Sequence, residues 1–325
     1  MLIILFLLSL LFHSELFVIN GDTMHTYYQV KICDKKIPQN LKTGIEKILT
    51  AVENQFSSYA LGNKIAEINK NAGIRAVKVS PQLCFVIKKA VEIAQQSDSA
   101  FDPTIGPLID LWNFRNCKQF PPSSQDVRKV KQLVNWRELE LENCKVFLKK
   151  KGMKLQLSGI AKGYGIDLVA DFLKKSGIKN AMVEIGGDIY CFGKGPNGKN
   201  WRIGIRDPLH KERLIAEISV TDVGIATSGN YENCIWWRGK RYGHLIDPRT
   251  GYPVDNKLES VTIIAPTCIQ ADAWATAVFV LGWEEGRKVI VNRPQLEGVI
   301  IRKTNGHIDI WTSPGIRDKI ILYGN

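Results

Sequence analysis

The spacing of apolar residues along the chain predicts a mixture of helices and strands. Between residues 41 and 56, apolar side chains recur at intervals of three and four, as on the buried face of an amphipathic helix. Residues 81–96 form a second predicted helix that begins at Pro81, a position that suits proline because the first turn has unpaired N–H groups. Residues 26–32 alternate between apolar and polar, which indicates a strand with one buried face.

Residues 155–188 predict a strand, a helix and a second strand. The first strand begins at Leu155, the helix runs from about residue 159 to residue 176, and the second strand covers residues 181–185. Glycines crowd the first junction, where bare backbone can approach either a ligand or a packed neighbour closely. An anion fits the unpaired N–H groups of a helix start. The spacing leaves helix packing and anion binding open, and it matches neither a dinucleotide fingerprint nor a P-loop.

The C-terminal half is predicted to consist mainly of strands. Expected elements are strands at residues 201–205, 214–220 and 261–265, a small-residue turn at 224–231, hairpins at 234–245 and 298–311, and a helix at 269–281. Short strands are also expected around Leu139 and Val146. No linker divides the chain after residue 20, so we expect one α+β domain, residues 20–325, of mixed sheets with packed helices.

The N-terminus carries a continuous apolar run over residues 2–12. This run is short for a membrane span but matches the apolar region of a signal peptide. No Lys or Arg precedes it, and no clear cleavage site follows. We expect residues 1–19 to be a signal peptide or an N-terminal membrane anchor, and the protein to be exported. A misassigned start or a buried strand is the alternative.

Composition narrows the function only slightly. The chain has 325 residues and a net charge of +12, but no basic run interleaved with aromatic residues, so a nucleic-acid module is not indicated. The positive balance favours an anionic ligand or surface. The seven cysteines contain no CxxC pair, which argues against a zinc site or a redox pair. Dispersed cysteines are typical of buried thiols, and the sequence also allows one disulfide bridge.

Two groups of polar residues are candidates for chemistry. Asp272 and Thr276 lie four apart on one face of an apolar helix, and their oxygens would suit magnesium. An acid interacting with the helix dipole and a threonine bonded to its own backbone explain the spacing at least as well. His244, Asp247 and Arg249 combine an imidazole, a carboxylate and a guanidinium in one turn, which alone indicates an ordinary surface turn.

Three further residues are weaker candidates. Asp102 and Asp188 occupy tight turns, where aspartate commonly accepts hydrogen bonds from nearby backbone and can also bind a ligand. Ser228 lacks the GxSxG elbow of a serine hydrolase.

Eight segments in order resemble the FAD:protein FMN transferases, the ApbE-like flavin transferases. They span residue 21 to about residue 283 and read GDTMHTYYQV, FSSY…IAEIN, AFDPTIGPLIDLWNF, LSGIAKGYGIDLVADFL, VEIGGDIY, IATSGNYE, HLIDPRTGYPV and VTIIAPTCIQADAWATAVFVLG. The resemblance implies a T-fold-like catalytic domain that binds FAD and Mg²⁺. It implies transfer of FMN to a threonine of a target flavoprotein, with release of AMP. The expected acceptor is a subunit of a membrane electron-transfer complex, and the protein itself is expected in the periplasm or anchored to the outer face of the cytoplasmic membrane.

The resemblance also assigns roles to residues. The metal ligands are Asp272, Thr276 and the backbone carbonyl of Ala161, which reverses the interpretation from spacing. His244 takes the role of base or phosphate-orienting group, and Lys162 meets phosphate. Other residues that match FAD-binding positions are Met24, Tyr59, Ala100, Phe101, Asp102, Ser158, Tyr164 and Ile246.

The chain departs from the family pattern at three places. His25 replaces a glycine near the flavin, Gln156 replaces an aspartate near the metal, and residues 60–69 lack the usual acidic and serine residues. The change at His25 bears on access to the flavin, and the change at Gln156 bears on metal affinity or the number of metal ions. The change in residues 60–69 bears on how the adenine end of FAD is bound. Hydrolysis of FAD to FMN and AMP, or flavin binding without catalysis, are the alternative functions.

Overall fold

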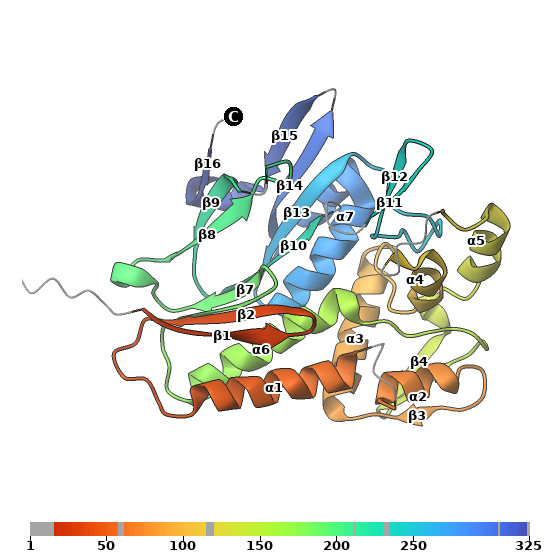
Figure 1. The fold of residues 1–325 in the computed structure, drawn as a ribbon, viewed down its shortest axis with the longest axis horizontal. Helices are drawn as coiled ribbons and strands as arrows, with labels where there is room; N and C mark the ends of the chain where they lie inside the picture. The colour runs from red at the N-terminus through yellow and green to blue at the C-terminus, as the bar shows by residue number, and fades with distance from the viewer. Residues whose placement is uncertain are drawn as a thin grey trace, which may run out of the picture.

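The computed structural model describes residues 16–57, 62–114, 120–210, 212–229, 234–304 and 306–323. An eight-stranded sheet with antiparallel neighbours forms the centre of the fold (Figure 1). Its strands, in spatial order, are β1 (Phe17–Thr23), β2 (Thr26–Ile32), β6 (Ala181–Ile185), β7 (Asp188–Phe192), β10 (Val223–Gly229), β13 (Leu258–Ala265), β14 (Glu297–Thr304) and β15 (His307–Thr312).

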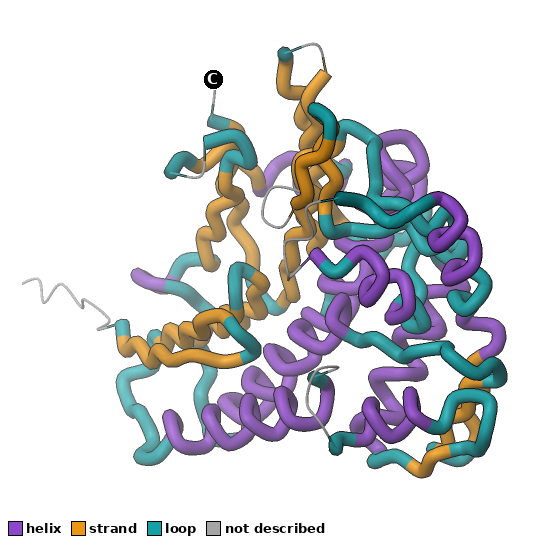
Figure 2. Tube along the Cα trace, turned by 45° about the vertical axis from the view of Figure 1, so that its right-hand side comes forward, coloured by secondary structure: helices purple, strands orange, loops and turns teal. Residues whose placement is uncertain are grey.

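Helices cover one face of this sheet. Helix α6 (Ser158–Lys175) packs on β6 and β7, and helix α7 (Cys268–Val291) packs on β10 and β13. Helix α1 (Leu41–Phe56) lies beside α6 (Figures 1 and 2). The alternation of β2 explains this layering, because Tyr28, Val30 and Ile32 are buried in the core that contains α1 and α6.

A smaller sheet covers part of the opposite face. It consists of β16 (Ile320–Leu322), β9 (Leu214–Val220) and β8 (Trp201–Arg206), in that order. Its buried residues Trp201, Ile203 and Ile205 share a core with residues of β7, β10, β13 and β14. The β8–β9 hairpin lies on the side of the large sheet opposite to α1 and α6 (Figure 1).

The remaining elements belong to neither of these two sheets. They are helices α2 (Lys64–Lys70), α3 (Pro81–Gln96), α4 (Gly106–Trp112) and α5 (Ser124–Lys131), the sheet β3 (Val77–Lys78), β5 (Lys145–Leu148) and β4 (Leu139–Glu142), the hairpin β11 (Cys234–Trp237) and β12 (Lys240–Gly243), and short 3-10 helices at Trp136–Glu138, Pro196–Gly198 and Pro314–Lys319.

Most of the predicted elements are confirmed, and two are wrong. The helices at 41–56 and 81–96 and the strand at 26–32 have the predicted bounds. Residues 155–157 form no strand, and the only pairing nearby is an isolated bridge between Lys154 and Ile105. Of the predicted turn at 224–231, residues 230 and 231 lie outside the described residues, whereas residues 224–229 lie in β10, an inner strand. Their small side chains reflect close packing, because a Cβ on Gly224 would lie 2.3 Å from the backbone nitrogen of Cys268.

The structure contains one disulfide among its described residues, between Cys84 of α3 and Cys144 of the β4–β5 turn. Cys191 and Cys268 are buried thiols, and Cys33 is half-buried. None of the described helices is both long enough and apolar enough to cross a bilayer. Strand β1 begins at Phe17, two residues before the predicted end of the leader segment at residue 19, and residues 1–15 of that segment lie outside the described part.

Candidate functional site

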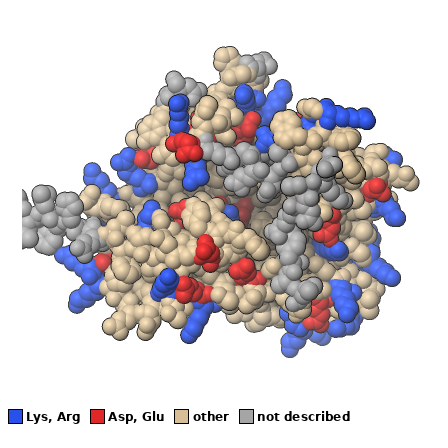
Figure 3. Space-filling model, viewed as in Figure 1, with Lys and Arg blue, Asp and Glu red and all other residues tan. Residues whose placement is uncertain are grey.

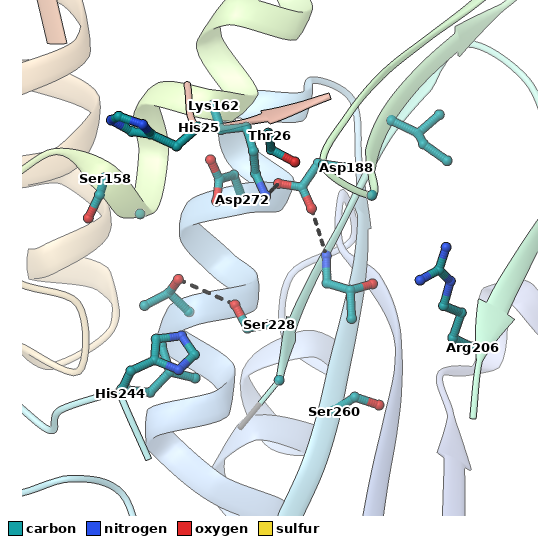
Figure 4. A pocket seen from close by; sticks show the side chains of 18 of the residues that line it. His25, Thr26, Ser158, Lys162, Asp188, Arg206, Ser228, His244, Ser260 and Asp272 are labelled. Atoms are coloured by element: carbon teal, nitrogen blue, oxygen red, sulfur yellow. Dashed lines mark hydrogen bonds and ion pairs between the residues drawn. The ribbon is translucent and has the colours of Figure 1, made fainter. Parts of the chain in front are cut away.

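One large cavity, of about 1380 Å³, lies between the helices and the two sheets. This volume exceeds the roughly 300–1,000 Å³ typical of pockets for small ligands, so a dinucleotide fits its size. The start of α6, the first turns of α7, the β1–β2 turn and the beginning of β7 all contribute to its lining (Figure 4). On the face drawn in Figure 3, Lys and Arg side chains are spread around the periphery with acidic groups between them.

Helices α6 and α7 approach closely at Gly163. A Cβ at this position would lie 2.3 Å from the backbone oxygen of Cys268, so a side chain would force the helices apart. The Gly163 N–H donates to Oδ2 of Asp272 over 2.9 Å. In the reverse direction, Asp167 of α6 accepts the Cys268 and Ile269 N–H groups at 2.8 and 2.9 Å. Each helix therefore binds the other through a carboxylate, which fixes Asp272 relative to α6.

A buried ion pair lies next to this contact. Lys162 Nζ is 2.8 Å from Asp188 Oδ2, whose side chain is only 3% exposed. Asp188 Oδ1 also accepts the N–H of Thr227, 3.1 Å away (Figure 4). Burial raises the pKa of Asp188, and the Lys162 ammonium opposes that rise. Burial disfavours the ammonium, yet the carboxylates of Asp188 and Asp272 raise the pKa of Lys162 overall, so the lysine is a fixed cation.

The Asp272 carboxyl lies in an environment that favours an added cation. Burial, and then the nearby Asp188 carboxylate, raise the pKa of Asp272 to about 7 against the opposing effect of Lys162. Two buried acids thus share one lysine, which leaves negative charge to be neutralised. Among the described residues, Oδ1 of Asp272 accepts no hydrogen bond.

Asp272 and Thr276, one helical turn apart, both line the cavity. The Thr276 hydroxyl is 3.4 Å from that of Ser228. Within the described part, no three His, Cys, Asp or Glu side chains converge as a metal cluster. Magnesium does not require one, because it commonly uses one or two carboxylates together with water and substrate phosphate. The oxygen donors of Asp272 and Thr276 therefore fit this ion. Ala161 lies on α6 directly before Lys162, and its carbonyl as a third ligand stays a prediction.

His244 and its turn occupy the opposite wall. His244, Ile246 and Pro248 line the cavity. Asp247 instead accepts three donors from Arg249, the backbone N–H at 2.8 Å and Nε and Nη2 at 2.9 Å each. Neither Asp247 nor Arg249 is among the lining residues, so the surface-turn explanation holds for this pair, while His244 faces the cavity.

The predicted FAD-binding residues divide into two groups. Those that line the cavity are Ala100, Phe101, Asp102, Ser158, Lys162 and Ile246. Asp102 also fixes its own turn, because it accepts the N–H and hydroxyl of Thr104 at 2.7 and 2.6 Å and the N–H of Trp136 at 3.0 Å.

The other predicted residues lie behind the lining or outside the described part. Tyr164 packs against Phe56 with ring centroids 5.4 Å apart. The Met24 N–H donates to Glu53 Oε2 over 3.2 Å, and the Met24 side chain packs on the core. Tyr59 lies outside the described residues.

The departures at His25 and Gln156 both fall on the cavity. Met24 and His25 form the two-residue turn between β1 and β2, with φ values of 49° and 61°. Such a turn favours glycine because a Cβ is strained at positive φ. Gln156 is buried, and its Oε1 accepts the N–H of Ser158 over 3.2 Å. An amide thus occupies the place where the resemblance implies a carboxylate.

Residues 24–300 match the ApbE family. The chain belongs to this family. Among curated ApbE relatives, an FAD:protein FMN transferase of Vibrio cholerae is 35% identical over 308 residues, covering 92% of this chain and 91% of that protein. The FAD:protein FMN transferase of Escherichia coli K12 is 32% identical over 322 residues and covers 96% and 91%.

Solved ApbE structures share the fold. The flavin transferase ApbE from Vibrio cholerae has a TM-score of 0.86 at 32% identity, covering 94% of this chain and 99% of that chain. An ApbE protein from Thermotoga maritima has a TM-score of 0.82 at 30% identity and covers 91% and 96%. The recognised family and the α+β fold class are thereby confirmed.

Sequence reasoning missed several contacts at the ApbE site. It did not assign Asp167, which caps α7 from α6, or the pairing of Lys162 with Asp188. Both contacts join residues that lie far apart in the chain, so no local spacing encodes them. The one available signal was the presence of acidic residues in otherwise apolar segments, since a buried carboxylate requires a partner.

Proposed function

We propose that this protein is a magnesium-dependent FAD:protein FMN transferase. It moves the FMN half of FAD onto a threonine hydroxyl of a target flavoprotein and releases AMP. The observation that carries the proposal is the convergence of Asp272, Thr276, the Lys162–Asp188 pair and His244 on one dinucleotide-sized cavity. Membership of the ApbE family, and relatives named FAD:protein FMN transferase, support it.

Different residues of the chain have different roles in phosphoryl transfer. Asp272, Thr276 and the Ala161 carbonyl hold magnesium, which when bound neutralises phosphate charge and orients the diphosphate. Lys162, held by Asp188, supplies a fixed positive charge for phosphate oxygens. The start of α6, with Ser158 lining the cavity, offers backbone N–H groups to the same anion.

The transfer breaks the phosphoanhydride bond between the two halves of FAD and forms a phosphoester bond to threonine. The threonine Oγ attacks the phosphorus on the FMN side, and the bond from that phosphorus to the AMP oxygen breaks. His244 accepts the hydroxyl proton, because an imidazole is the side chain suited to proton transfer near neutral pH. The target is a flavoprotein subunit of a membrane electron-transfer complex.

We also propose that the protein works outside the cytoplasm, in the periplasm or anchored to the outer face of the cytoplasmic membrane, with residues 1–19 as signal or anchor. The Cys84–Cys144 disulfide supports this location, since disulfides persist in oxidising compartments and are rare in reducing ones.

One assay distinguishes the three candidate activities. The protein is incubated with FAD, Mg²⁺ and a candidate acceptor domain, and the products are separated on a denaturing gel and by chromatography. Covalent flavin fluorescence on the acceptor together with AMP supports transfer. Free FMN and AMP without acceptor indicate hydrolysis, and unchanged FAD indicates a binding protein.

Two variants test the assigned roles. Asp272→Asn should abolish Mg²⁺-dependent turnover, while Asp171→Asn, an exposed acid on α6, should leave it unchanged. Full turnover of Asp272→Asn at limiting Mg²⁺ would contradict the metal assignment. His244→Ala should retain FAD binding and transfer slowly. Weakened FAD binding with an unchanged rate for bound FAD would remove His244 from the base role.

A further inference from the structure

The large cavity extends beyond the reaction site into a groove beside β8. On the far side of Asp188 from His244, its lining continues along Ile189 of β7, Glu184 of β6 and Tyr27 and Lys31 of β2. The floor of this groove is the part of the large sheet's second face that the β16–β9–β8 sheet leaves uncovered. Its Tyr27 hydroxyl donates to Glu184 Oε1 over 2.6 Å.

The wall of the groove is the edge of a strand. Five consecutive residues of β8, from Arg202 to Arg206, line the cavity. Their side chains alternate between the core and solvent, so a cavity that touches all five must run along the backbone edge. Within the part of the chain that the structure describes, strand β8 pairs with β9 alone and its other edge forms no backbone hydrogen bond.

Positively charged side chains lie beside this strand edge. Arg202 is held by Glu217, with Nη2 2.8 Å from Oε2. Arg206 and Lys31 make no ion pair within the described part of the chain. Figure 4 shows Arg206 across the cavity from Asp188, on the side away from His244. The groove therefore offers two cations that form no ion pair among the described residues, together with the Glu184 carboxylate and a row of backbone donors and acceptors.

We propose that the acceptor protein binds here as an added strand. An extended segment flanking the target threonine pairs with the free edge of β8 and lies over the uncovered face of β2 and β6, and an acidic side chain of that segment pairs with Arg206. The edge of five residues spans roughly 16 Å at about 3.3 Å per residue, enough to hold a segment of similar length. The continuous cavity then leads the threonine toward Lys162 and Asp188.

The backbone edge favours a polypeptide over the dinucleotide as occupant. A strand edge presents donors and acceptors at a regular spacing that another peptide backbone matches and FAD does not. This inference rests on the transfer activity proposed above, since it identifies where the acceptor of that reaction binds.

The first test reverses the charge at Arg206. Arg206→Glu should raise the KM for the acceptor domain about tenfold, with kcat at saturating acceptor and the Kd for FAD within twofold of the unaltered protein. Arg317→Glu, at an exposed arginine that does not line the cavity, is the matched control and should change none of the three quantities. In the acceptor domain, each acidic residue near the target threonine is then replaced by lysine in turn. One of these replacements should restore the KM of Arg206→Glu.

The second test measures whether the backbone amides of β8 are protected when the acceptor binds. Hydrogen exchange with and without acceptor should show slowed exchange of the β8 amides between residues 202 and 206, and no change in the amides of β16. An unchanged acceptor KM for Arg206→Glu together with unprotected β8 amides would overturn the docking site while transfer itself persists. A raised Kd for FAD in Arg206→Glu would place the dinucleotide in the groove instead. Absence of transfer by the unaltered protein would overturn the proposed function and this inference with it.

Discussion

The contact between α6 and α7 at Gly163 gives a sharp prediction. In a Gly163→Ala variant the new Cβ would lie 2.3 Å from the backbone oxygen of Cys268 and 2.8 Å from the Cα of Ile269. Both neighbours are backbone atoms of another helix, so no side-chain rotation relieves the clash. The helices must move until the shortest contact grows from 2.3 Å to at least 3.0 Å.

The expected cost combines two opposing effects. Overpacking of a rigid contact costs about 1–3 kcal/mol, whereas alanine in place of glycine in a helix stabilises it by about 1 kcal/mol. We expect Gly163→Ala to lower the free energy of unfolding by up to about 2 kcal/mol, the difference between these two effects. The same shift displaces Asp272, whose Oδ2 accepts the Gly163 N–H, relative to Lys162. Misplacement of reacting groups by about 1 Å can slow a reaction ~100-fold, so we expect transfer to slow 10- to 100-fold.

Gly165→Ala is the matched control on the same helix. Its Cβ would lie 3.0 Å from the Cε of Met24, the tip of a flexible side chain, and 3.5 Å from the Cγ1 of Val52, an ordinary contact distance. This variant should be as stable as the unaltered protein or up to about 1 kcal/mol more stable. Thermal unfolding and FMN transfer at saturating FAD and Mg²⁺ measure both variants, and a change of 1 kcal/mol corresponds to roughly 2–4 °C in Tm.

The reasoning fails if Gly163→Ala and Gly165→Ala behave alike. Equal Tm values would mean that the α6–α7 contact yields without cost. A destabilised Gly163→Ala protein that transfers FMN at the normal rate would mean that this contact does not position the groups that hold the diphosphate.

Three further predictions concern stability. Burial raises the pKa of Asp167 to about 7 although the Ile269 and Cys268 N–H groups oppose it, so between about pH 4 and 7 the folded protein keeps a proton that the unfolded chain has lost. This group's contribution to stability is complete below about pH 4 and is lost as pH rises to 7, by up to ~1.4 kcal/mol per pH unit. In urea unfolding, the stability of Asp167→Asn should not show this dependence on pH. Cys84→Ser should lower stability by about 3–4 kcal/mol because it opens a loop of 60 residues, and dithiothreitol should shift the Tm of the unaltered protein but not of this variant. His25→Gly should raise the free energy of unfolding by about 0.5–1 kcal/mol, since the residue adopts a φ of 61°; a lowered Tm would mean that the His25 side chain makes a stabilising contact.

Local patterns predicted the elements whose signals are local. The stripe from Leu41 to Phe56 and the helix that begins at Pro81 have the predicted bounds because their faces and ends depend on neighbouring residues alone. Strand β2 followed from alternation in the same way. The site prediction depended on the family resemblance, since the spacing of Asp272 and Thr276 alone left the metal site and ordinary helix chemistry open.

Elements shaped by distant packing could not be predicted in this way. Strand β10 resembles a turn in sequence, because glycine, alanine and serine are common in turns. Its small residues instead make room for the start of α7. Cys268 lies 44 residues after Gly224 in the chain (268 − 224), and only the fold brings the two together. The Lys162–Asp188 pair and the α7 cap by Asp167 likewise depend on contacts between segments that the sequence does not place together.

The glycines of α6 show why their two possible roles could not be separated from the sequence. A Cβ on Gly159 would lie 3.4 Å from the Thr276 hydroxyl, at the cavity, whereas a Cβ on Gly163 would strike the backbone of α7. One glycine thus leaves room beside a proposed metal ligand, and the next permits the helix contact that holds Asp272 in place. Close packing and ligand access are consequences of one arrangement: the site exists because two helices approach more closely than side chains would allow.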